Sequence, residues 1–277
     1  MFDRMRYRKR QVRSDRQTRC DILYLTFNRL AYTRTTLPAL LDSVGDLGSV
    51  TVVDNHSTDG TARYLESLDH PALRAVMFNR LNRGLVKPTR EFWRDSRAEF
   101  VGKIDNDILV PRDWLEKLVA AHEGFAGLGI VGFCHFRRDD YDETVVTAQV
   151  EWFDGVYLRR QPWIGGNYLA RRSVLMANPD YRSSWKGLRR RILQGFNSYQ
   201  QRLAGRGYVN GYLADAQGRL LHWTHLDDPR EPRFLPESAA ASTRRLGPDR
   251  IVEWYRRDAK ALLEEYRPPV HTPSRPS

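Results

Sequence analysis

The feature that most constrains the fold of this chain is a repeated alternation of short apolar runs and amphipathic segments. The run DILYLTFNR, residues 21–29, predicts a buried strand that ends in polar residues. A helical pattern follows, with apolar positions on one face: Leu37, Leu40, Leu41 and Val44. The order then repeats, with predicted strands at 49–54, 73–77 and 99–105 and predicted helices at 61–68, 86–97 and from Pro111.

Such alternation predicts an α/β fold with a mainly parallel sheet that is covered by helices on both faces. Ligands of these folds bind beyond the carboxyl ends of the strands, so the polar clusters there are the candidate site residues. Beyond Ile130 the pattern is less regular. It predicts a strand at 129–136, a helix at 196–205 that ends at glycine, and a helix within Pro248–Tyr266.

The composition is that of an ordinary folded protein, with 41% hydrophobic and 29% charged residues. Cys20 and Cys134 lie far apart without paired spacing, which argues against a disulfide framework and favours a reducing compartment. The chain contains neither an apolar run long enough for a spanning helix nor a signal-peptide core near Met1. We therefore expect a cytoplasmic protein.

Positive charge is concentrated near the N-terminus in a chain whose net charge is +11. We expect a basic, disordered arm at 1–19, one main domain at 20–235, and a C-terminal helix with a proline-rich tail at 236–277. The arm has three interpretations: a solvated tail, attraction to an anionic membrane surface, or nucleic-acid binding. Since no helix-turn-helix, zinc-finger or aromatic RNA-binding pattern accompanies the charge, we expect no nucleic-acid partner.

The sharpest local motif is GKIDNDIL, in which a predicted strand runs into Asp105 and Asp107. Two carboxylates at a strand end are suited to hold Mg²⁺ or Mn²⁺ together with the oxygens of a diphosphate. Neutralising the diphosphate makes it a better leaving group. Asp-x-Asp is also common by chance, and the alternative is an exposed turn beside a helix cap.

Four segments in order carry a resemblance to a known family: LTFNR at 25–29, VVDNHSTDGT at 52–61, NRG at 82–84, and DND before ILVPRDWLEKL. Together they resemble family 2 glycosyltransferases. The resemblance implies a single GT-A (Rossmann-like) domain with a mainly parallel central sheet flanked by helices, here with a C-terminal helical extension. It also implies a nucleoside diphosphate sugar donor, Mn²⁺ or Mg²⁺ as cofactor, and inverting transfer to an acceptor hydroxyl.

Carried over position by position, the resemblance places these residues at the nucleotide sugar: Thr26, Asn28, Arg29, Asp54, Asn55, Asn82, Gly84, Lys87 and Asp105. Asp54 would accept a hydrogen bond from a ring N–H of the base. Its alternative role is to cap the following turn, and Lys87 is equally well explained as an exposed helix charge. Asp105 and Asp107 would hold the metal.

The second half resembles the family more weakly. In WIGGNYLARR, the resemblance assigns Trp163, Gly165 and Gly166 to the sugar and acceptor, although Trp163 is equally well explained as a core residue. The expected metal-binding histidine is His222, with His225 as its competitor.

The acidic pair that usually supplies the catalytic base is replaced by Gly195 and Phe196. We therefore name Asp154 as the first candidate for the base, with Asp227 and Asp228 behind it.

The sequence favours a glycosyltransferase that acts on a glycan or lipid-linked acceptor, as in cell-envelope polysaccharide synthesis, with peripheral contact at the inner membrane face. Three rivals stay open. One is a nucleotide-sugar-binding relative without activity, and another is a basic nucleic-acid or anionic-surface binding module. The third is a sugar-1-phosphate nucleotidyltransferase, but TFNRLAYTR lacks the glycine-rich phosphate loop that it would need.

Overall fold

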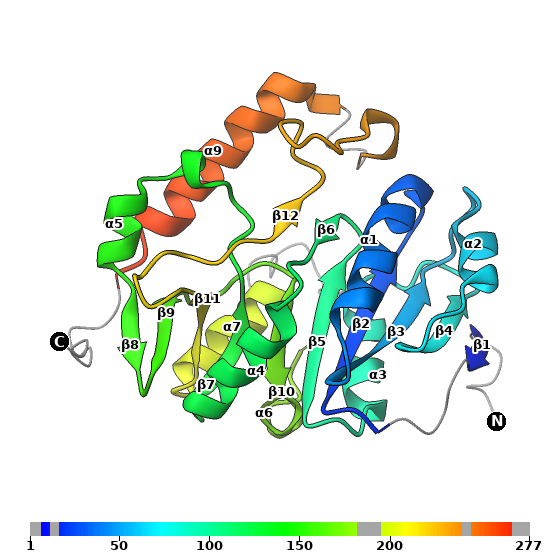
Figure 1. Cartoon of the computed structure of the whole chain (residues 1–277), viewed down its shortest axis with the longest axis horizontal. Coiled ribbons are helices and arrows are strands. Elements are labelled where there is room, and N and C mark those ends of the chain that lie inside the picture. Colours follow the sequence, from blue (N-terminus) through cyan, green and yellow to red (C-terminus); the bar gives the residue numbers. More distant parts are fainter. Residues whose placement is uncertain (1–6, 12–16, 182–194, 240–244, 268–277) are drawn as a thin grey trace, which may run out of the picture. The chain divides into compact units, whose positions relative to one another are not determined.

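The computed structural model describes residues 7–11, 17–181, 195–239 and 245–267. It forms two compact units, one from residues 1–115 and 171–196 and the other from 116–170 and 197–277. Both units contain strands and helices, so the α/β class predicted from the sequence is confirmed (Figure 1). The domain bounds at 19/20 and 235/236 stay a prediction, and the proline-rich tail at 268–277 lies outside the described residues.

The first unit contains the strands that the alternating pattern predicted. Together with β1, which the pattern did not predict, they lie in the order β1-β4-β3-β2-β5. The bounds are Tyr7–Gln11 for β1, Cys20–Thr26 for β2, Gly48–Asp54 for β3, Leu73–Asn79 for β4 and Phe100–Asp105 for β5. β2 pairs with β3 and β5, and β3 pairs with β4, all in parallel. The carboxyl ends of β2, β3, β4 and β5 therefore lie at one edge of this sheet.

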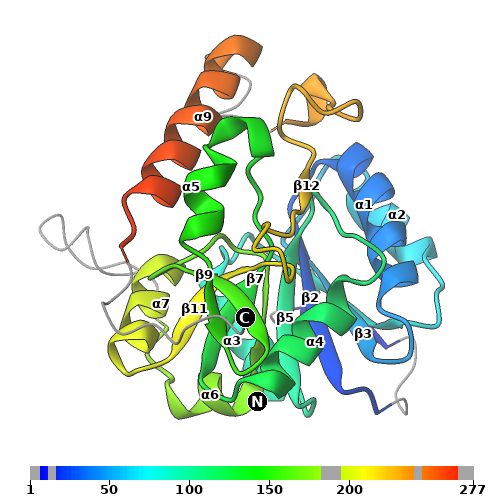
Figure 2. The same cartoon turned by 60° about the vertical axis from the view of Figure 1, so that its left-hand side comes forward.

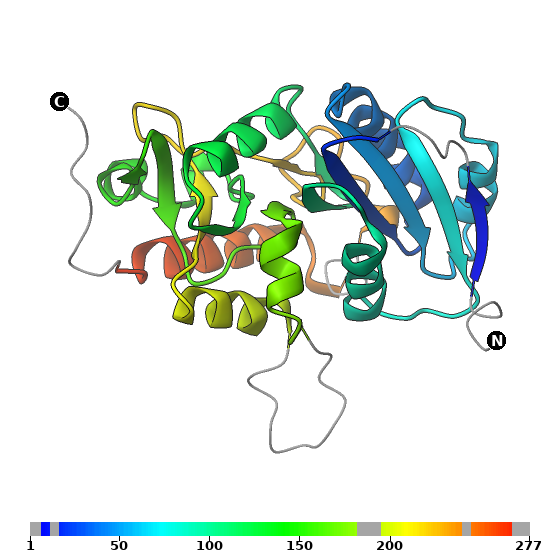
Figure 3. The same ribbon diagram turned by 90° about the horizontal axis from the view of Figure 1, so that it is seen from below.

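Helices cover both faces of this sheet, with α1 and α3 on opposite sides (Figure 3). The helices are α1 (Leu30–Ser43), α2 (Thr61–Ser67), α3 (Val86–Asp95) and α6 (Arg172–Ala177); β6 is the short strand Ile108–Leu109. Every residue of β2 and β3 is buried. This double coverage explains why these strands read as continuous apolar runs rather than as alternating ones.

The expectation of a fully disordered arm at 1–19 is wrong for residues 7–11. These residues form β1, which pairs antiparallel with β4, Tyr7 opposite Asn79 and Gln11 opposite Ala75. The arm is too charged to build a core of its own, but an edge strand needs only the unpaired backbone groups of its neighbour. Residues 1–6 and 12–16 lie outside the described residues.

The second unit has a mixed sheet in the order β10-β7-β11-β9-β8. The bounds are Tyr168–Arg171 for β10, Leu128–Gly132 for β7, Val209–Leu213 for β11, Val156–Arg160 for β9 and Glu151–Phe153 for β8. Only β7 and β11 pair in parallel; β7 with β10, β11 with β9, and β9 with β8 are antiparallel. This mixture explains why the sequence pattern lost its regularity beyond Ile130.

The remaining elements surround this second sheet. They are α4 (Trp114–Gly124), η2 (Arg138–Asp140), α5 (Glu143–Ala148), α7 (Phe196–Gly205), β12 (Thr224–His225), η3 (Pro236–Ser238) and α9 (Pro248–Glu264). The helices predicted at 196–205 and within 248–266 are thus confirmed. α9 packs against η2 and α5 (Figure 2). Its buried face is Ile251, Tyr255, Ala259 and Leu263.

Two polar side chains from β9 and the residue after it hold the C-terminal end of α9. The guanidinium of the fully buried Arg159 donates to the carbonyl oxygen of Leu263. Gln161 donates from Nε2 to the carbonyl oxygen of Leu262 at 2.9 Å. The last carbonyls of a helix lack partners within it, so these donors fix the helix end. Burial lowers the pKa of Arg159 to about 10.

In the part of the chain that the structure describes, the helices are all too short or too polar to cross a membrane.

Candidate functional site

The loops that follow β2 and β3 are tied to each other by side chains. Asn28 and Arg29 both have left-handed backbone angles, with φ of 57° and 65°. The backbone N–H of Asn28 donates to Ser57 Oγ at 2.7 Å, and Asn28 Oδ1 accepts from the N–H of Thr58 at 2.8 Å. Left-handed non-glycine residues cost about 1–3 kcal/mol unless their surroundings hold them. These hydrogen bonds stabilise the left-handed backbone conformation, so the loop is preformed.

Asp54, at the end of β3, is 2% exposed and turns back onto its own loop. It accepts a hydrogen bond from the hydroxyl of Ser57 and another from the Ser57 backbone N–H at 3.2 Å. Burial raises the pKa of the Asp54 carboxyl above its usual value. Asp54 thus caps the turn in this structure, and its contact with the base stays a prediction.

Asn55 links β3 to the loop after β4. Its Nδ2 donates to Asn82 Oδ1 at 2.7 Å and to the carbonyl oxygen of Gly84 at 3.2 Å. Its Oδ1 accepts from Asn79 Nδ2 at 3.0 Å and from the N–H of Arg83 at 2.9 Å. Asn55, Asn82 and Gly84, three of the predicted nucleotide-site residues, are therefore brought together as one hydrogen-bonded group.

A second group joins the loop after β2 to the acidic motif after β5. Asn106 is 7% exposed and donates from Nδ2 to Thr26 Oγ1 at 3.0 Å. Arg29 donates from NH1 to Asp107 Oδ2 at 3.0 Å and lies 4.6 Å above the ring of Tyr32. Sequence reasoning missed Asn106, although its position between the two aspartates was the available signal.

The other missed residue is Lys103, which is 5% exposed on β5. Its Nζ forms an ion pair with Asp105 Oδ1. Alternate residues of a strand face the same side, so Lys103 and Asp105 are neighbours on one face. Among the ion pairs that the structure describes, Asp105 pairs with Lys103, and Asp107 pairs with Arg29.

Lys87 is exposed in the first turn of α3. It lines a pocket of about 400 Å³ between α3 and α6, together with Arg90, Arg94, Leu175 and Met176. The structure gives no contact between Lys87 and the two hydrogen-bonded groups above. The assignment of Lys87 to the nucleotide site stays a prediction.

In the second unit, the segment that contains Trp163, Gly165 and Gly166 follows the end of β9. The side chain of Gln200 forms two hydrogen bonds with the backbone of Ile164 in this segment. Oε1 accepts from the Ile164 N–H and Nε2 donates to the Ile164 carbonyl oxygen, both at 3.0 Å. Trp163 and Gly165 line one pocket of about 650 Å³, whose other wall is α9. Trp163 is therefore partly exposed at a pocket and is not a core residue.

His222 and His225 line a smaller pocket of about 240 Å³ in the same unit. His222 Nε2 lies 2.8 Å from the hydroxyl of Tyr141, and the two rings are stacked. His225 Nδ1 lies 3.1 Å from the hydroxyl of Tyr255 on α9. Burial, with a smaller contribution from Arg138, lowers the pKa of His222 to about 4, so its imidazole is neutral at pH 7.

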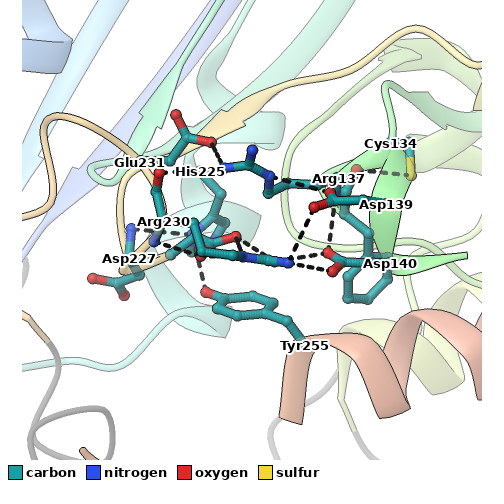
Figure 4. A network of polar contacts seen from close by, with 11 residues as sticks. Cys134, Arg137, Asp139, Asp140, His225, Asp227, Arg230, Glu231 and Tyr255 are labelled. Carbon is teal, nitrogen blue, oxygen red and sulfur yellow. Dashed lines mark hydrogen bonds and ion pairs between the residues drawn. The ribbon is translucent and has the colours of Figure 1, made fainter. Parts of the chain in front are cut away.

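An ion-pair network lies beside these histidines (Figure 4). Arg230 donates to Asp140 at 2.6 and 2.9 Å and to Asp228 at distances from 2.6 to 3.0 Å. Burial lowers the pKa of Arg230, but the hydrogen bonds to Asp140 and Asp228 outweigh it and raise the pKa above its usual value. Asp228, one of the reserve candidates for the base, is thus engaged by Arg230, and Asp227, the other, is 6% exposed.

The structure separates Asp154 from the other acceptor candidates. Asp154 is an exposed residue of the β8–β9 turn, with φ of 46°, and only Gly155 separates it from β9. Trp163 and Gly165 follow the opposite end of the same strand. A five-residue strand is about 16 Å long. The role of Asp154 as the base stays a prediction.

A family model described as Glycosyl transferase family 2 matches residues 21–196, which is more than half of the 277 residues. The chain belongs to glycosyl transferase family 2. The matched range contains the loops after β2, β3, β4 and β5 and the acidic motif. The resemblance stated from those loops is thus confirmed.

Solved structures share the fold of this family 2 chain at low sequence identity. The mannosyltransferase PcManGT from Pyrobaculum calidifontis, in complex with GDP-Man and Mn²⁺, matches with a TM-score of 0.56 and 20% identity over 77% of this chain and 58% of that chain. S. aureus TarS 1-349 in complex with UDP-GlcNAc matches with a TM-score of 0.51 and 16% identity over 75% of this chain and 58% of that chain. The expected GT-A fold is confirmed. The family 2 chain spans less than two thirds of either length, and no curated protein matches it.

The acidic motif of this family 2 chain fits a divalent cation. Asp105 and Asp107 offer hard carboxylate oxygens at a strand end, and Mg²⁺ or Mn²⁺ commonly takes one or two carboxylates and completes its shell with phosphate oxygens and water. Among the described residues, no group of three or more His, Cys, Asp or Glu is arranged to hold a metal by itself. His222 belongs to the other unit and stays a prediction as a ligand.

Proposed function

We propose that this family 2 chain transfers a sugar from a nucleoside diphosphate sugar to an acceptor hydroxyl, with inversion at the anomeric carbon. One observation carries the proposal. The loops after β2, β3, β4 and β5 meet at one sheet edge and are joined by the hydrogen bonds of Asn28, Asn55 and Asn106. A preformed polar edge of this kind is where parallel α/β sheets bind nucleotides.

In this proposal the residues of the edge have separate tasks. Asp54 accepts from a ring N–H of the base once its bonds to Ser57 are rearranged. Asn55 keeps Asn82 and Gly84 in place beside the nucleotide. Arg29 exchanges its bond to Asp107 for one to the diphosphate, which presents the same kind of oxygen acceptor.

Asp105 and Asp107 would hold Mg²⁺ or Mn²⁺, which when bound neutralises the diphosphate as it leaves. The acceptor oxygen forms a bond to the anomeric carbon while the bond from that carbon to the diphosphate oxygen breaks, and the acceptor proton passes to a base. The mannosyltransferase neighbour with GDP-Man and Mn²⁺ supports this choice of donor class and metal.

The deciding experiment titrates the purified chain with UDP-, dTDP- and GDP-sugars with and without Mn²⁺. We expect one donor to bind only with metal, and Asp107→Asn to abolish that binding. Asp69→Asn is the matched control, because Asp69 is an exposed aspartate of the same unit outside the motif. Failure of every donor under every metal condition would contradict the proposal. Donor binding without any nucleotide release would favour the inactive relative.

Contact with a membrane surface is a separate part of the proposal, since lipid-linked acceptors of cell-envelope polysaccharides are met there. The net charge of +11 and the arginines near the N-terminus support it. Each cation near an anionic surface contributes about 1 kcal/mol. Changing Arg13 and Arg16 to Gln should weaken sedimentation with phosphatidylglycerol vesicles, and unchanged sedimentation would refute the contact. Binding of nucleic acid in the same salt titration would instead favour the basic module.

A further inference from the structure

The larger pocket of the second unit has a wall that the sequence motifs did not indicate. Its volume is about 650 Å³, and α9 forms one side while the segment that follows β9 forms the other. α9 contributes Trp254 and Asp258 among others, and Glu265, the residue that follows the helix, also lines the pocket. Gln161 and Trp163 line the opposite side, and Asn197 contributes an amide.

The pocket residues of α9 form one stripe along the helix. Trp254, Asp258 and Glu265 are spaced four and seven residues apart, which places them on one side of a helix. The buried residues Ile251, Tyr255, Ala259 and Leu263 occupy the neighbouring side and attach α9 to its unit. Trp254 lies outside this buried face and leaves 42% of its surface exposed. An indole held at the mouth of a pocket is available to a ligand.

Both walls are fixed before any ligand binds. Arg159 and Gln161 hold the last carbonyls of α9, as described above. Gln200 clamps Ile164, and Asn210 Nδ2 donates to the carbonyl oxygen of Pro162 at 3.3 Å. A preformed pocket spares the ligand the cost of ordering side chains and loops.

The chemistry of the lining suits a sugar ring. Indole faces pack against the C–H faces of pyranoses, while amides and carboxylates bond to hydroxyl groups. Asp258 and Glu265 make the α9 wall acidic in a chain of net charge +11. Arg257, which pairs with Asp258 at 3.1 Å, is 70% exposed and does not line the pocket. Carboxylates repel phosphate and uronate groups, so the lining disfavours an anionic sugar.

We propose that this pocket binds an uncharged glycosyl residue of the acceptor, and that Trp254 and Asp258 of α9 and the adjoining Glu265 select it. The inference rests on the proposed glycosyl transfer and names the acceptor class for it. It gives the C-terminal helix a role in acceptor selection rather than in donor binding.

The test measures glycan binding without donor, by saturation-transfer NMR and tryptophan fluorescence. The probes are tetrasaccharides of glucose, mannose and N-acetylglucosamine and their 6-phosphorylated counterparts. We expect at least one neutral tetrasaccharide to bind, its phosphorylated form to bind at least tenfold more weakly, and Trp254→Ala to weaken binding at least tenfold. Trp254→Phe, which keeps an aromatic face, should restore most of it.

Glu265→Gln and Glu253→Gln form a matched pair, because both glutamates are exposed on or next to α9 and only Glu265 lines the pocket. Glu265→Gln should reduce the discrimination against the phosphorylated sugar, and Glu253→Gln should not. Equal effects of the two variants, absence of binding by every neutral probe, or preference for the phosphorylated form would overturn the inference.

Donor titrations on the same preparations keep the two proposals apart. Metal-dependent donor binding without glycan binding would contradict the acceptor inference but not the proposed transfer. Glycan binding without any donor binding would support the pocket as a glycan site and contradict the proposed transfer.

Discussion

Arg29 donates a 3.0 Å hydrogen bond to Asp107, so one of the two carboxylates that would hold a metal is paired with a cation of the protein. Both side chains are mostly buried, at 16% and 13% exposure. A metal and Arg29 therefore compete for the same carboxylate until the diphosphate offers Arg29 another partner.

Replacing Arg29 with Gln should tighten Mn²⁺ binding in the absence of donor and weaken donor binding. Loss of a competing pair worth about 1 kcal/mol corresponds to about fivefold in metal affinity. Electron paramagnetic resonance of free Mn²⁺ measures the first effect, and donor titration measures the second. Arg63→Gln, at an exposed position of α2, is the control. Weaker Mn²⁺ binding by the Arg29 variant would contradict the competition.

Replacing Lys103 with Met should destabilise the first unit, because it removes a buried cation that forms an ion pair with Asp105. Breaking a fully buried pair costs about 3–5 kcal/mol, and since Asp105 retains 32% exposure we expect about 1–2 kcal/mol. Urea unfolding monitored by circular dichroism checks this. Lys260→Met, at an exposed position of α9, should change the free energy of unfolding by less than about 0.5 kcal/mol. An unchanged free energy of unfolding for Lys103→Met would mean that the pair does not stabilise the fold.

Replacing Arg230 with Met should be among the most destabilising single changes in the second unit. The side chains of Asp140 and Asp228 are 1% and 4% exposed, and without Arg230 both carboxylates would be buried without their cation. We expect a loss of about 3–5 kcal/mol in urea unfolding. Arg219→Met removes an exposed pair with Asp215 and should cost less than about 1 kcal/mol. Comparable losses from the two variants would refute a special role for the Arg230 network.

His222 should make stability depend on pH between about 4 and 6.5. Its pKa is lowered from 6.5 to about 4 in the folded chain, so the unfolded chain binds the proton more tightly. The contribution of the neutral ring is fully present above pH 6.5 and is lost as the pH falls toward 4. Urea unfolding from pH 4 to 7.5 should give a shallower pH dependence for His222→Gln, whereas the exposed His56→Gln should keep the wild-type slope. Parallel profiles for all three proteins would exclude His222 as the source.

Replacing Asp154 with Asn should leave transfer within about twofold of wild type, since a surface change away from the site perturbs little. The residue lies at the exposed β8–β9 turn, at the far end of β9 from Trp163. Nucleotide release with the acceptor identified from the pocket measures this. A loss of a hundredfold or more would return Asp154 to the role of base, and would place the acceptor away from Trp163.

The sequence by itself determined the first unit and the order of its binding loops. Continuous apolar runs such as 20–26 and 48–54 arise because a parallel sheet is buried on both faces, and each run ends in the polar residues of one sheet edge. Local patterns of this kind also predicted α7 and α9, because amphipathic spacing and terminal glycines act within a few residues.

Only the tertiary structure decided which residues meet. Asn106 donates a hydrogen bond to Thr26, and Lys103 forms an ion pair with Asp105. The sequence indicated the two aspartates of the acidic motif but neither of these contacts. The sequence also did not indicate the neighbouring strand with which residues 7–11 pair. Trp254 and Trp163 are 91 positions apart in the numbering, 254 − 163, yet line one pocket. Contacts at such separations follow from chain topology, which residue patterns along a single strand or helix do not encode.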